Sequence, residues 1–513
     1  MFACPNCGGN IKFHIPTQQL SCEFCNSQFD PYSFDNKEKD AEEQQFYETT
    51  VFTCPQCGGE LLSTDNASAA FCSFCGASTV LFSRISKEKR PGYIIPFQKT
   101  KEDCKQAYGN FMKHAVFAPK ELKDPAFIDG FRGIYMPYWA FYITQQGTFS
   151  LTAEKKYRRN DYIITDHYKL TGDLDCYYKG LSYDASSSFD DNISEALAPY
   201  DVKGMKAFTP AYFSGFYADT SDVPPEEYQG DAEYIAMSET FQRLSDSNAF
   251  RDYTIKSSPV PNKEDTLLHT KTESVDTAMF PVWFMSYRNK DRVCYATVNG
   301  QTGKVVCDLP VDIRKYLLSS AILSIPIFFL LNLLLTLLPT TVLSICGFLS
   351  VLASIIYVTE VSSIAKREPQ EENEKGFFRQ CFLPFYIVTA LGSLVFSILY
   401  GVIGSPSGTR GTPVLWSILS LVTFIIGIVS LTSLKHLSND HRRLFSLCLN
   451  LMIILCSNVL ISLHPASDIY YYTAVILLLI SICLMLTDII RYYNLLATRR
   501  LPQFDKTGGD DRA

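Results

Sequence analysis

The sequence Phe2-Ala-Cys-Pro-Asn-Cys-Gly-Gly9 returns fifty residues later as Phe52-Thr-Cys-Pro-Gln-Cys-Gly-Gly59. In each copy a second Cys-x-x-Cys pair follows after 14 intervening residues. Two such pairs supply four thiolates, the tetrahedral sulfur set that structural zinc binds at about 2.3 Å. The spacing therefore predicts two zinc ribbons and one zinc ion in each. The candidate metal ligands are the eight cysteines of the repeat: Cys4, Cys7, Cys22, Cys25, Cys54, Cys57, Cys72 and Cys75.

The residue that follows each pair supports this interpretation. A metal-binding knuckle turns sharply after its second cysteine, which favours a positive φ that Gly adopts freely and Asn tolerates. The four residues at these places are Gly8, Asn26, Gly58 and Gly76. Iron in a rubredoxin-like site is the alternative metal. A redox dithiol is disfavoured, because it expects a single Cys-x-x-Cys in a βαβ context. Other cysteines lack ligand spacing and are expected to be buried, for example Cys104, Cys346 and Cys483.

The charge distribution bears on the partner of the ribbons. The chain has 513 residues, 46 basic and 53 acidic, and a net charge of −7. Residues 1–83 hold three basic and ten acidic residues, so they alone sum to −7. A phosphate-binding surface needs clustered Lys and Arg. This composition disfavours nucleic acid. Docking of a protein or simple bracing of the chain by the ribbons fits better, and the expected partner is a cytoplasmic protein. Because Met1 leads directly into the first cysteine pair without a signal peptide, a reducing compartment is expected.

The C-terminal part of the sequence is strongly apolar. It contains runs of about 20 apolar residues, the length that crosses a bilayer core of about 30 Å. The six expected membrane spans are 316–338, 340–359, 381–403, 414–434, 444–463 and 469–490. Lys and Arg gather on alternate flanks, which predicts that both termini are cytoplasmic. The expectation is a multi-pass protein of the cell membrane with the lipid bilayer as a partner.

The region between the ribbons and the apolar runs shows strand and helix signals. Thr100-Lys-Glu-Asp103 is a capping-box start for a helix. Asn289-Lys-Asp291 and Asn299-Gly300 are turn signals between strands. Pro137-Tyr-Trp-Ala-Phe-Tyr142 is similar to Pro281-Val-Trp-Phe-Met-Ser286, which predicts related strands in one antiparallel sheet or in two facing sheets. The region is therefore expected to be an α+β domain rich in antiparallel sheet.

No catalytic set emerges from this region. Residues 231–250 have helical spacing and are expected to form a helix. Gly300-Gln-Thr-Gly-Lys304 lacks phosphate-loop spacing and is interpreted as a turn. Asp190-Asp191 is more typical of a loop than of a general acid and base. No catalytic or cofactor-binding residue is assigned, and whether the protein is an enzyme stays open, with a preference against it.

These observations define a multidomain chain with two small Cys4 zinc ribbons, an α+β domain and an all-α six-helix transmembrane domain. The expected boundaries are ribbon 1 at 1–35, an acidic linker at 36–50, ribbon 2 at 51–83, a basic linker at 84–92, the α+β domain at 93–312, the transmembrane domain at 313–495 and a cytoplasmic tail at 496–513.

The second ribbon, together with the aromatic and proline motifs that follow it, resembles a bacterial family of zinc-ribbon, multi-pass membrane proteins. The similarity spans roughly residues 52–310, and its motifs are Tyr93-Ile-Ile-Pro-Phe97, Tyr135-Met-Pro-Tyr-Trp139, Phe208-Thr-Pro-Ala-Tyr212, Phe280-Pro-Val-Trp283 and Asn299-Gly-Gln-Thr-Gly-Lys304. Its members are often described as transcription factor IIB-type ribbon proteins or as primosomal helicase relatives. The resemblance implies zinc ligands at the four cysteines of ribbon 2, and the added ribbon 1 departs from the pattern. The helicase description does not fit, because the sequence has no nucleotide-binding loop.

The function expected from the sequence is a membrane-anchored zinc-ribbon adaptor that binds a protein partner on the cytoplasmic face. The rival hypotheses are a ribbon-regulated transporter or channel, and a membrane enzyme that acts on lipid or peptide.

Overall fold

The computed structural model separates into two compact units, and each is described by itself. The first unit comprises residues 1–116, 120–308 and 499–513, and the second comprises 117–119 and 309–498. The structure describes residues 3–34, 46–63, 71–78, 81–256, 267–334 and 466–504, with isolated positions between 339 and 357 and between 446 and 460.

Ribbon 1 forms a small sheet of its own within the first unit. Its antiparallel strands are β1 (Ile11–His14), β2 (Gln19–Cys22) and β3 (Gln28–Phe29), followed by the 3-10 helix η1 (Pro31–Phe34). Strand β1 packs on the segment after the 3-10 helix η4 (Pro210–Phe213), where the Phe13 amide donates to the Ser214 carbonyl at 3.0 Å. The Phe13 ring meets Tyr212 edge to face at 5.2 Å between centroids. These contacts hold the strands of ribbon 1 against the rest of the unit.

A second, larger sheet joins ribbon 2 to the central domain. Within the described residues, thirteen strands belong to it, in the order β10-β7-β13-β8-β11-β5-β4-β6 along its main path. Strand β9 pairs with β8, β12 with β8, β14 with β13, and both β15 and β16 with β14. The strands are β4 (Phe46–Thr53), β5 (Glu60–Ser63), β6 (Phe82–Lys89), β7 (Tyr93–Ile94), β8 (Arg132–Arg159), β9 (Tyr162–Asp184), β10 (Lys206–Ala207), β11 (Tyr217–Ala218), β12 (Thr254–Ile255), β13 (Leu267–Asn289), β14 (Arg292–Asn299), β15 (Val305–Cys307) and β16 (Arg499–Arg500).

The two similar segments that begin at Pro137 and Pro281 lie on neighbouring strands of this sheet. β8 and β13 pair antiparallel, with Met136 opposite Phe280. Of the two predicted arrangements, the structure therefore has the single sheet. The pairing of β8 with β13 is antiparallel as expected, whereas β7 pairs with β13 and β11 pairs with β8 in parallel. The turns expected at 289–291 and 299–300 also connect β13 to β14 and β14 to β15 as predicted.

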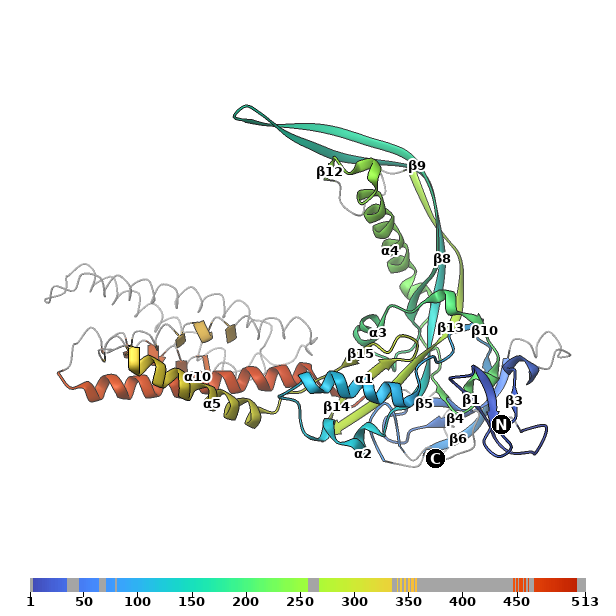
Figure 1. Cartoon of the computed structure of the whole chain (residues 1–513), viewed down its shortest axis with the longest axis horizontal. Helices are drawn as coiled ribbons and strands as arrows, with labels where there is room; N and C mark the ends of the chain where they lie inside the picture. Colours follow the sequence, from blue (N-terminus) through green and yellow to red (C-terminus); the bar gives the residue numbers. More distant parts are fainter. Residues whose placement is uncertain are drawn as a thin grey trace, which may run out of the picture. The chain divides into compact units, whose positions relative to one another are not determined.

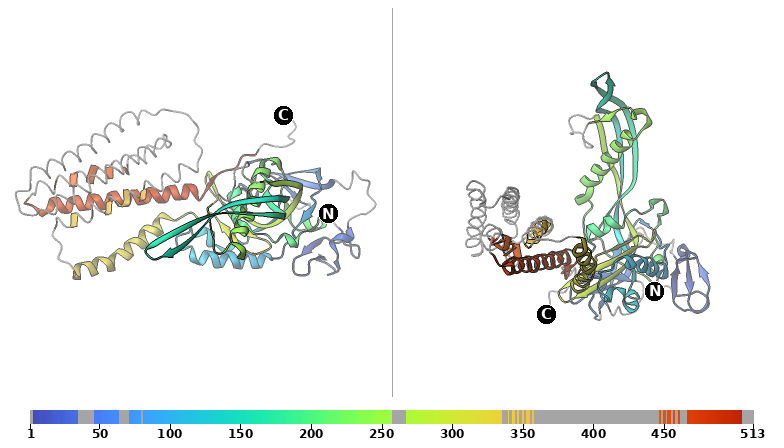
Figure 2. Two further views of the ribbon diagram at one scale, coloured as in Figure 1. Left: turned by 90° about the horizontal axis from the view of Figure 1, so that it is seen from above. Right: turned by 60° about the vertical axis from the view of Figure 1, so that its left-hand side comes forward.

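Strands β8 and β9 extend beyond the sheet as a long hairpin (Figures 1 and 2). Their register runs from Tyr138 opposite Asp184 to Arg159 opposite Tyr162. Asn160, in the turn, has a φ of 55°, which suits a tight hairpin connection. Helix α4 (Glu226–Ser245) contacts both strands and β13, and its small buried residues lie against apolar side chains of the hairpin. An exposed hairpin is thus supported by a helix along part of its length.

The helices of the first unit confirm some predicted boundaries and shift others. Helix α1 (Lys101–His114) begins at the predicted capping box, with Thr100 and Asp103 bonded reciprocally. The helix expected at 231–250 is α4, which begins five residues earlier because Glu226 and Glu227 favour a helix N-terminus although the apolar stripe starts later. The other helices are η2 (Glu121–Lys123), α2 (Pro125–Ile128), α3 (Asp191–Leu197), η3 (Val202–Gly204) and η5 (Asn248–Phe250).

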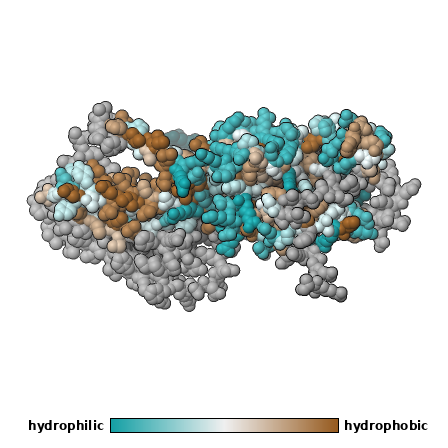
Figure 3. Space-filling view, turned by 90° about the horizontal axis from the view of Figure 1, so that it is seen from below, coloured by the Kyte–Doolittle hydropathy of each residue, from teal (hydrophilic) through white to brown (hydrophobic). Residues whose placement is uncertain are grey.

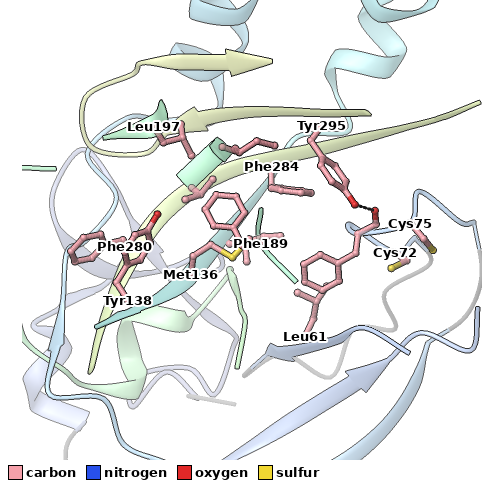
Figure 4. Close-up of a cluster of buried hydrophobic side chains, with 14 of the residues drawn as sticks. Leu61, Cys72, Cys75, Met136, Tyr138, Phe189, Leu197, Phe280, Phe284 and Tyr295 are labelled. Carbon is pink, nitrogen blue, oxygen red and sulfur yellow. Dashed lines mark hydrogen bonds between the residues drawn. The ribbon is translucent and has the colours of Figure 1, made fainter. Parts of the chain in front are cut away.

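One apolar core joins ribbon 2 to the central sheet. Buried side chains from β5, β8, β13, β14 and α3 form a continuous cluster that includes the four cysteines of ribbon 2. Figure 4 shows part of this cluster, with Cys72 and Cys75. The Tyr295 hydroxyl on β14 donates to the Phe74 carbonyl of ribbon 2 at 2.8 Å. Ribbon 2 and the sheet therefore share one core, so the linker expected at 84–92 does not separate them: its first six residues belong to β6, which pairs with β4.

Among the residues that the structure describes, the second unit has two long helices, α5 (Ile313–Leu334) and α10 (Asp468–Leu496). Described apolar side chains of this unit form a cluster that includes Leu343, Ile454 and Leu478. The Asn450 amide donates to Ser354 at 2.7 Å and its oxygen accepts from Ser481 at 2.8 Å, so this asparagine connects two other segments of the unit. Exposed apolar side chains of α5 and α10 gather on the surface (Figure 3).

The expected six-helix transmembrane domain is not what the structure shows. Among the described residues one helix, α10, is long and apolar enough to cross a membrane. The expected spans at 381–403 and 414–434 lie outside the described residues, and those at 340–359 and 444–463 are described only in part. The prediction was made from apolar length, a property also shown by helices that pack against one another. The multi-pass membrane location and the transporter hypothesis that depended on it are therefore not retained.

Candidate metal centres

The eight predicted cysteines assemble into two groups of four. Within each group all four sulfurs lie within 4.8 Å of one another. In ribbon 2 the sulfurs of Cys54 and Cys75 are 3.8 Å apart and those of Cys57 and Cys72 are 3.7 Å apart. A tetrahedron with metal–sulfur bonds of about 2.3 Å has edges of about 3.8 Å. The separations fit one four-coordinate metal ion and exceed a disulfide bond of about 2.05 Å.

The sulfurs of ribbon 1 lie slightly closer together. Cys4 and Cys25 are 3.5 Å apart, and Cys7 and Cys22 are 3.4 Å apart. All eight thiols are free. Each group can therefore hold a metal ion, and four thiolates are the ligand set of zinc or of an iron–sulfur site. That these cysteines are ligands stays a prediction, as does the identity of the metal.

The same backbone turn presents all four cysteine pairs. Gly8, Asn26, Gly58 and Gly76 have φ values of 72°, 56°, 76° and 70°, as the sequence predicts. In each turn the amide at this position donates to the carbonyl of the first cysteine of the pair, at distances from 2.8 to 3.1 Å. The amide of that first cysteine donates to the carbonyl of the residue directly after the positive-φ position. The peptide chain is thus shaped at each knuckle by its own hydrogen bonds.

Hydrogen bonds shift the pKa values of thiols in both groups. In ribbon 1 hydrogen bonding to Ser27 lowers the pKa of the Cys25 thiol to about 6. In ribbon 2 hydrogen bonding to Cys57 lowers the pKa of Cys54, whereas hydrogen bonding to Cys54 raises the pKa of Cys72. A metal cation would displace these protons and bind the thiolates, so metal uptake releases protons.

The two centres differ in burial. All four cysteines of ribbon 2 are buried, whereas Cys7 and Cys25 of ribbon 1 are exposed. The same contrast applies to the phenylalanine inside the second pair of each ribbon. Phe24 is 76% exposed and Phe74 is 0% exposed, although both rings lie over the second glycine of the opposite knuckle. The two equivalent phenylalanines of the repeat therefore lie in different environments.

The C-terminal segment after α10 covers the ring of Phe74. Phe504 meets Phe74 edge to face at 5.8 Å between centroids, and its amide donates to the Cys57 carbonyl at 2.7 Å. A Cβ at Gly58 would lie 2.2 Å from the Phe504 carbonyl oxygen, so Gly58 serves both the turn and this approach. The segment that contains Phe504 thus covers the knuckle of ribbon 2.

An arginine holds the same segment on the sheet. Arg499 forms ion pairs with Asp190 at 3.1 Å and Asp308 at 3.7 Å, and its guanidinium lies 5.4 Å from the centre of the Tyr295 ring. Sequence reasoning treated residues 496–513 as a tail and missed this contact. The sequence feature that could have predicted this contact is the presence of the apolar residues Leu501 and Phe504 in a polar segment.

Other residues considered in the sequence have structural places. The sequence suggested a loop for Asp190 and Asp191. Instead, Asp190 is the N-cap of α3 and Asp191 is the first residue of that helix. Gly303, with a φ of 83°, lies in the predicted turn between β14 and β15. Cys104 and Cys346 are buried as predicted, whereas Cys483 is exposed.

Comparison with known proteins places the chain among relatives. No family model matches it, and no solved structure matches it. The broader ribbon family that it resembles is therefore not shown. The chain is similar to the uncharacterized protein YdjG of Bacillus subtilis (strain 168), with 33% identity over 321 residues. The alignment covers 61% of this chain and 91% of YdjG. By this identity and coverage, the chain belongs to the same family as YdjG.

Proposed function

We propose that the protein is a zinc-dependent interaction protein whose two ribbons have different tasks. Ribbon 2 is a structural centre that completes the core of the first unit. Ribbon 1 is a docking surface for a protein partner, with Phe24 as its central contact. The observation that carries this proposal is the contrast between the exposed Phe24 and the covered Phe74 in equivalent positions of the repeat.

Ribbon 2 indicates what kind of partner would suit ribbon 1. In ribbon 2 an extended segment places an aromatic ring on Phe74 and donates a backbone hydrogen bond to the Cys57 carbonyl. Within the described residues no backbone amide donates to the corresponding Cys7 carbonyl. Ribbon 1 therefore offers an exposed ring and a backbone acceptor with the same relation to each other. We infer that the partner presents an extended segment with an aromatic side chain.

Charge narrows the partner further. Residues 1–83 have a net charge of −7, and Lys12, one of their three basic residues, is paired with Glu23 at 2.7 Å. A region with so few basic residues does not suit a phosphate backbone, which needs clustered Lys and Arg. The proposed partner is therefore a protein segment with an aromatic residue, and not a nucleic acid.

Four thiolates without histidine suit zinc, and iron is the competing metal. Elemental analysis of purified full-length protein should give about two zinc ions per chain. An iron–sulfur site would also colour the protein, because thiolate-bound ferric iron absorbs visible light and zinc does not. Protein that contains neither metal after purification without chelators would argue against the proposal.

Docking through ribbon 1 can be tested by site-specific photocrosslinking in cells. A photoreactive amino acid at Glu23, beside the proposed contact, should capture a partner, and the additional substitution Phe24→Ala should abolish that capture. The matched control is Ile85→Ala, because Ile85 is 80% exposed on β6, outside the ribbon knuckles. Capture that survives Phe24→Ala, or that is lost equally with Ile85→Ala, would contradict the proposal.

A further inference from the structure

A cavity of about 420 Å³ lies at the base of the β8–β9 hairpin, apart from both cysteine centres. Its walls come from the end of β9, from α3 and the residues after it, from α4, and from Tyr138 of β8. A volume of this size is typical of a small-molecule site. All of its lining residues are described, and none of them is Lys, Arg or His.

Aromatic rings form one part of the wall. Tyr183 of β9 stacks on Tyr228 of α4 with centroids 5.3 Å apart and planes 16° apart. Tyr138 and Tyr200 meet edge to face at 5.9 Å. The faces of tyrosine rings attract cations, and this attraction increases when water is excluded. The rings alone fit either a neutral or a cationic ligand.

Carboxylates form the other part. Asp184 lies at the end of β9, Asp191 and Glu195 lie on α3, and Asp231 lies on α4. Asp184 is buried and the other three are exposed, and with no basic residue in the lining the walls carry a net negative charge. A cationic ligand is therefore favoured over a neutral or anionic one.

Two buried polar atoms in this wall lack a hydrogen-bond partner. They are the Oδ2 atom of Asp184, a residue that is only 4% exposed, and the hydroxyl of Tyr183. A buried polar group without a partner carries a desolvation cost that no hydrogen bond offsets. Burial, reinforced by the charge of Asp191, raises the pKa of Asp184 to about 7. Both atoms can accept a hydrogen bond, so a ligand with N–H donors would remove this cost.

The carboxylates do not converge as metal ligands do. Within the described residues, the groups of three or more His, Cys, Asp or Glu that could hold one metal ion are the two cysteine clusters alone. The acidic residues instead line different walls, which suits a longer ligand with several separated positive charges. A protonated amine also supplies the N–H donors that Asp184 and Tyr183 lack, whereas a quaternary ammonium does not.

We propose that this cavity binds an aliphatic polyamine, with one protonated amino group at Asp184 and Tyr183 and the alkyl chain along the tyrosine rings. The remaining ammonium groups interact with the carboxylates of α3 and α4. This site does not depend on the zinc centres or on a protein partner.

Isothermal titration of the full-length protein with spermidine tests the proposal. Spermidine should bind, and Asp184→Asn should weaken its affinity by about tenfold or more, because a charge-assisted bond is lost. Asp231→Asn, at an exposed position on α4, should also weaken it and provides a second variant should Asp184→Asn fail to fold. The matched control is Asp173→Asn, an exposed position on the same strand as Asp184, which should leave the affinity unchanged.

Three further ligands distinguish the chemistry. Neutral 1,4-butanediol should not bind, and choline should bind more weakly than spermidine because it has no N–H donor. Nα-acetyl-lysine amide carries a single ammonium group and should also bind more weakly. Absence of spermidine binding, or binding that is unaffected by both Asp184→Asn and Asp231→Asn, would overturn the site. Tighter binding of the lysine derivative or of choline would overturn the polyamine assignment.

Discussion

Phe24 and Phe74 occupy the same place in the two ribbons but differ in burial, so the effects of substituting them on stability can be compared directly. Phe74 is completely buried, with ring centroids 6.3 Å from Phe284 and 5.8 Å from Phe504. Truncation of a buried phenylalanine to alanine costs about 3–5 kcal/mol. Phe24 is 76% exposed, so about a quarter of its surface is buried. At about 25 cal/mol per Å² and about 200 Å² per ring, that fraction amounts to about 1 kcal/mol.

The assay is calorimetry on full-length, zinc-loaded protein. Phe74→Ala should lower the Tm of the first unit by roughly 6–20 °C, since 1 kcal/mol corresponds to about 2–4 °C for units of this size class. Phe24→Ala should lower it by no more than about 4 °C. Phe74→Ala should also release one zinc ion to a chelator faster, because the cover over that centre is lost. Equal effects of the two substitutions on Tm would refute the claim that only ribbon 2 belongs to the core.

Three other predictions follow from the same contacts. Serine substitution of both Cys54 and Cys57 should remove about one zinc ion and unfold much of the first unit. The equivalent substitution of Cys4 and Cys7 in ribbon 1 should also remove about one zinc ion but change the Tm only slightly. Elemental analysis measures the zinc content and calorimetry measures the Tm. Arg499→Ala should release the C-terminal segment at a cost of about 1–3 kcal/mol, seen as faster proteolysis of that segment and a lower Tm. Asp184→Asn should change the pH dependence of stability. The pKa of Asp184 is raised in the folded state from 3.8 to about 7, so its ionisation destabilises the wild type as pH rises across that range, and the stability of the variant relative to wild type should increase between pH 4 and pH 8.

The local structure of the ribbons could be predicted from the sequence because it depends on short-range constraints. Cysteine spacing fixes which sulfurs can meet, and a positive φ selects Gly or Asn after each pair. These rules predicted all four turns, including the one at Asn26. The capping box at Thr100 belongs to the same class, since its hydrogen bonds join residues three positions apart.

Contacts between distant segments were not predicted. The pairing of Arg499 with Asp190 joins residues that are about 300 positions apart, and no local pattern encodes it. The cavity likewise requires β9, α3 and α4 to meet, which depends on the packing of the sheet and not on any motif. The transmembrane prediction failed for a related reason. Apolar length reports how much surface a helix must bury but does not identify whether lipid or protein buries it.

The different burial of Phe24 and Phe74 is not explained by the repeat itself. Cysteine spacing and knuckle turns are the same in both, so neither property can account for their different burial. The difference comes from outside the repeat, because Phe504 and Phe284 cover Phe74 in ribbon 2. In ribbon 1 the strands are packed on the unit while the knuckle face keeps Phe24 in solvent. Burial within ribbon 1 accounts for only about 1 kcal/mol of stability at Phe24, far less than at Phe74. An aromatic residue there would gain the rest of its burial energy if another molecule supplied the cover that Phe504 provides to Phe74.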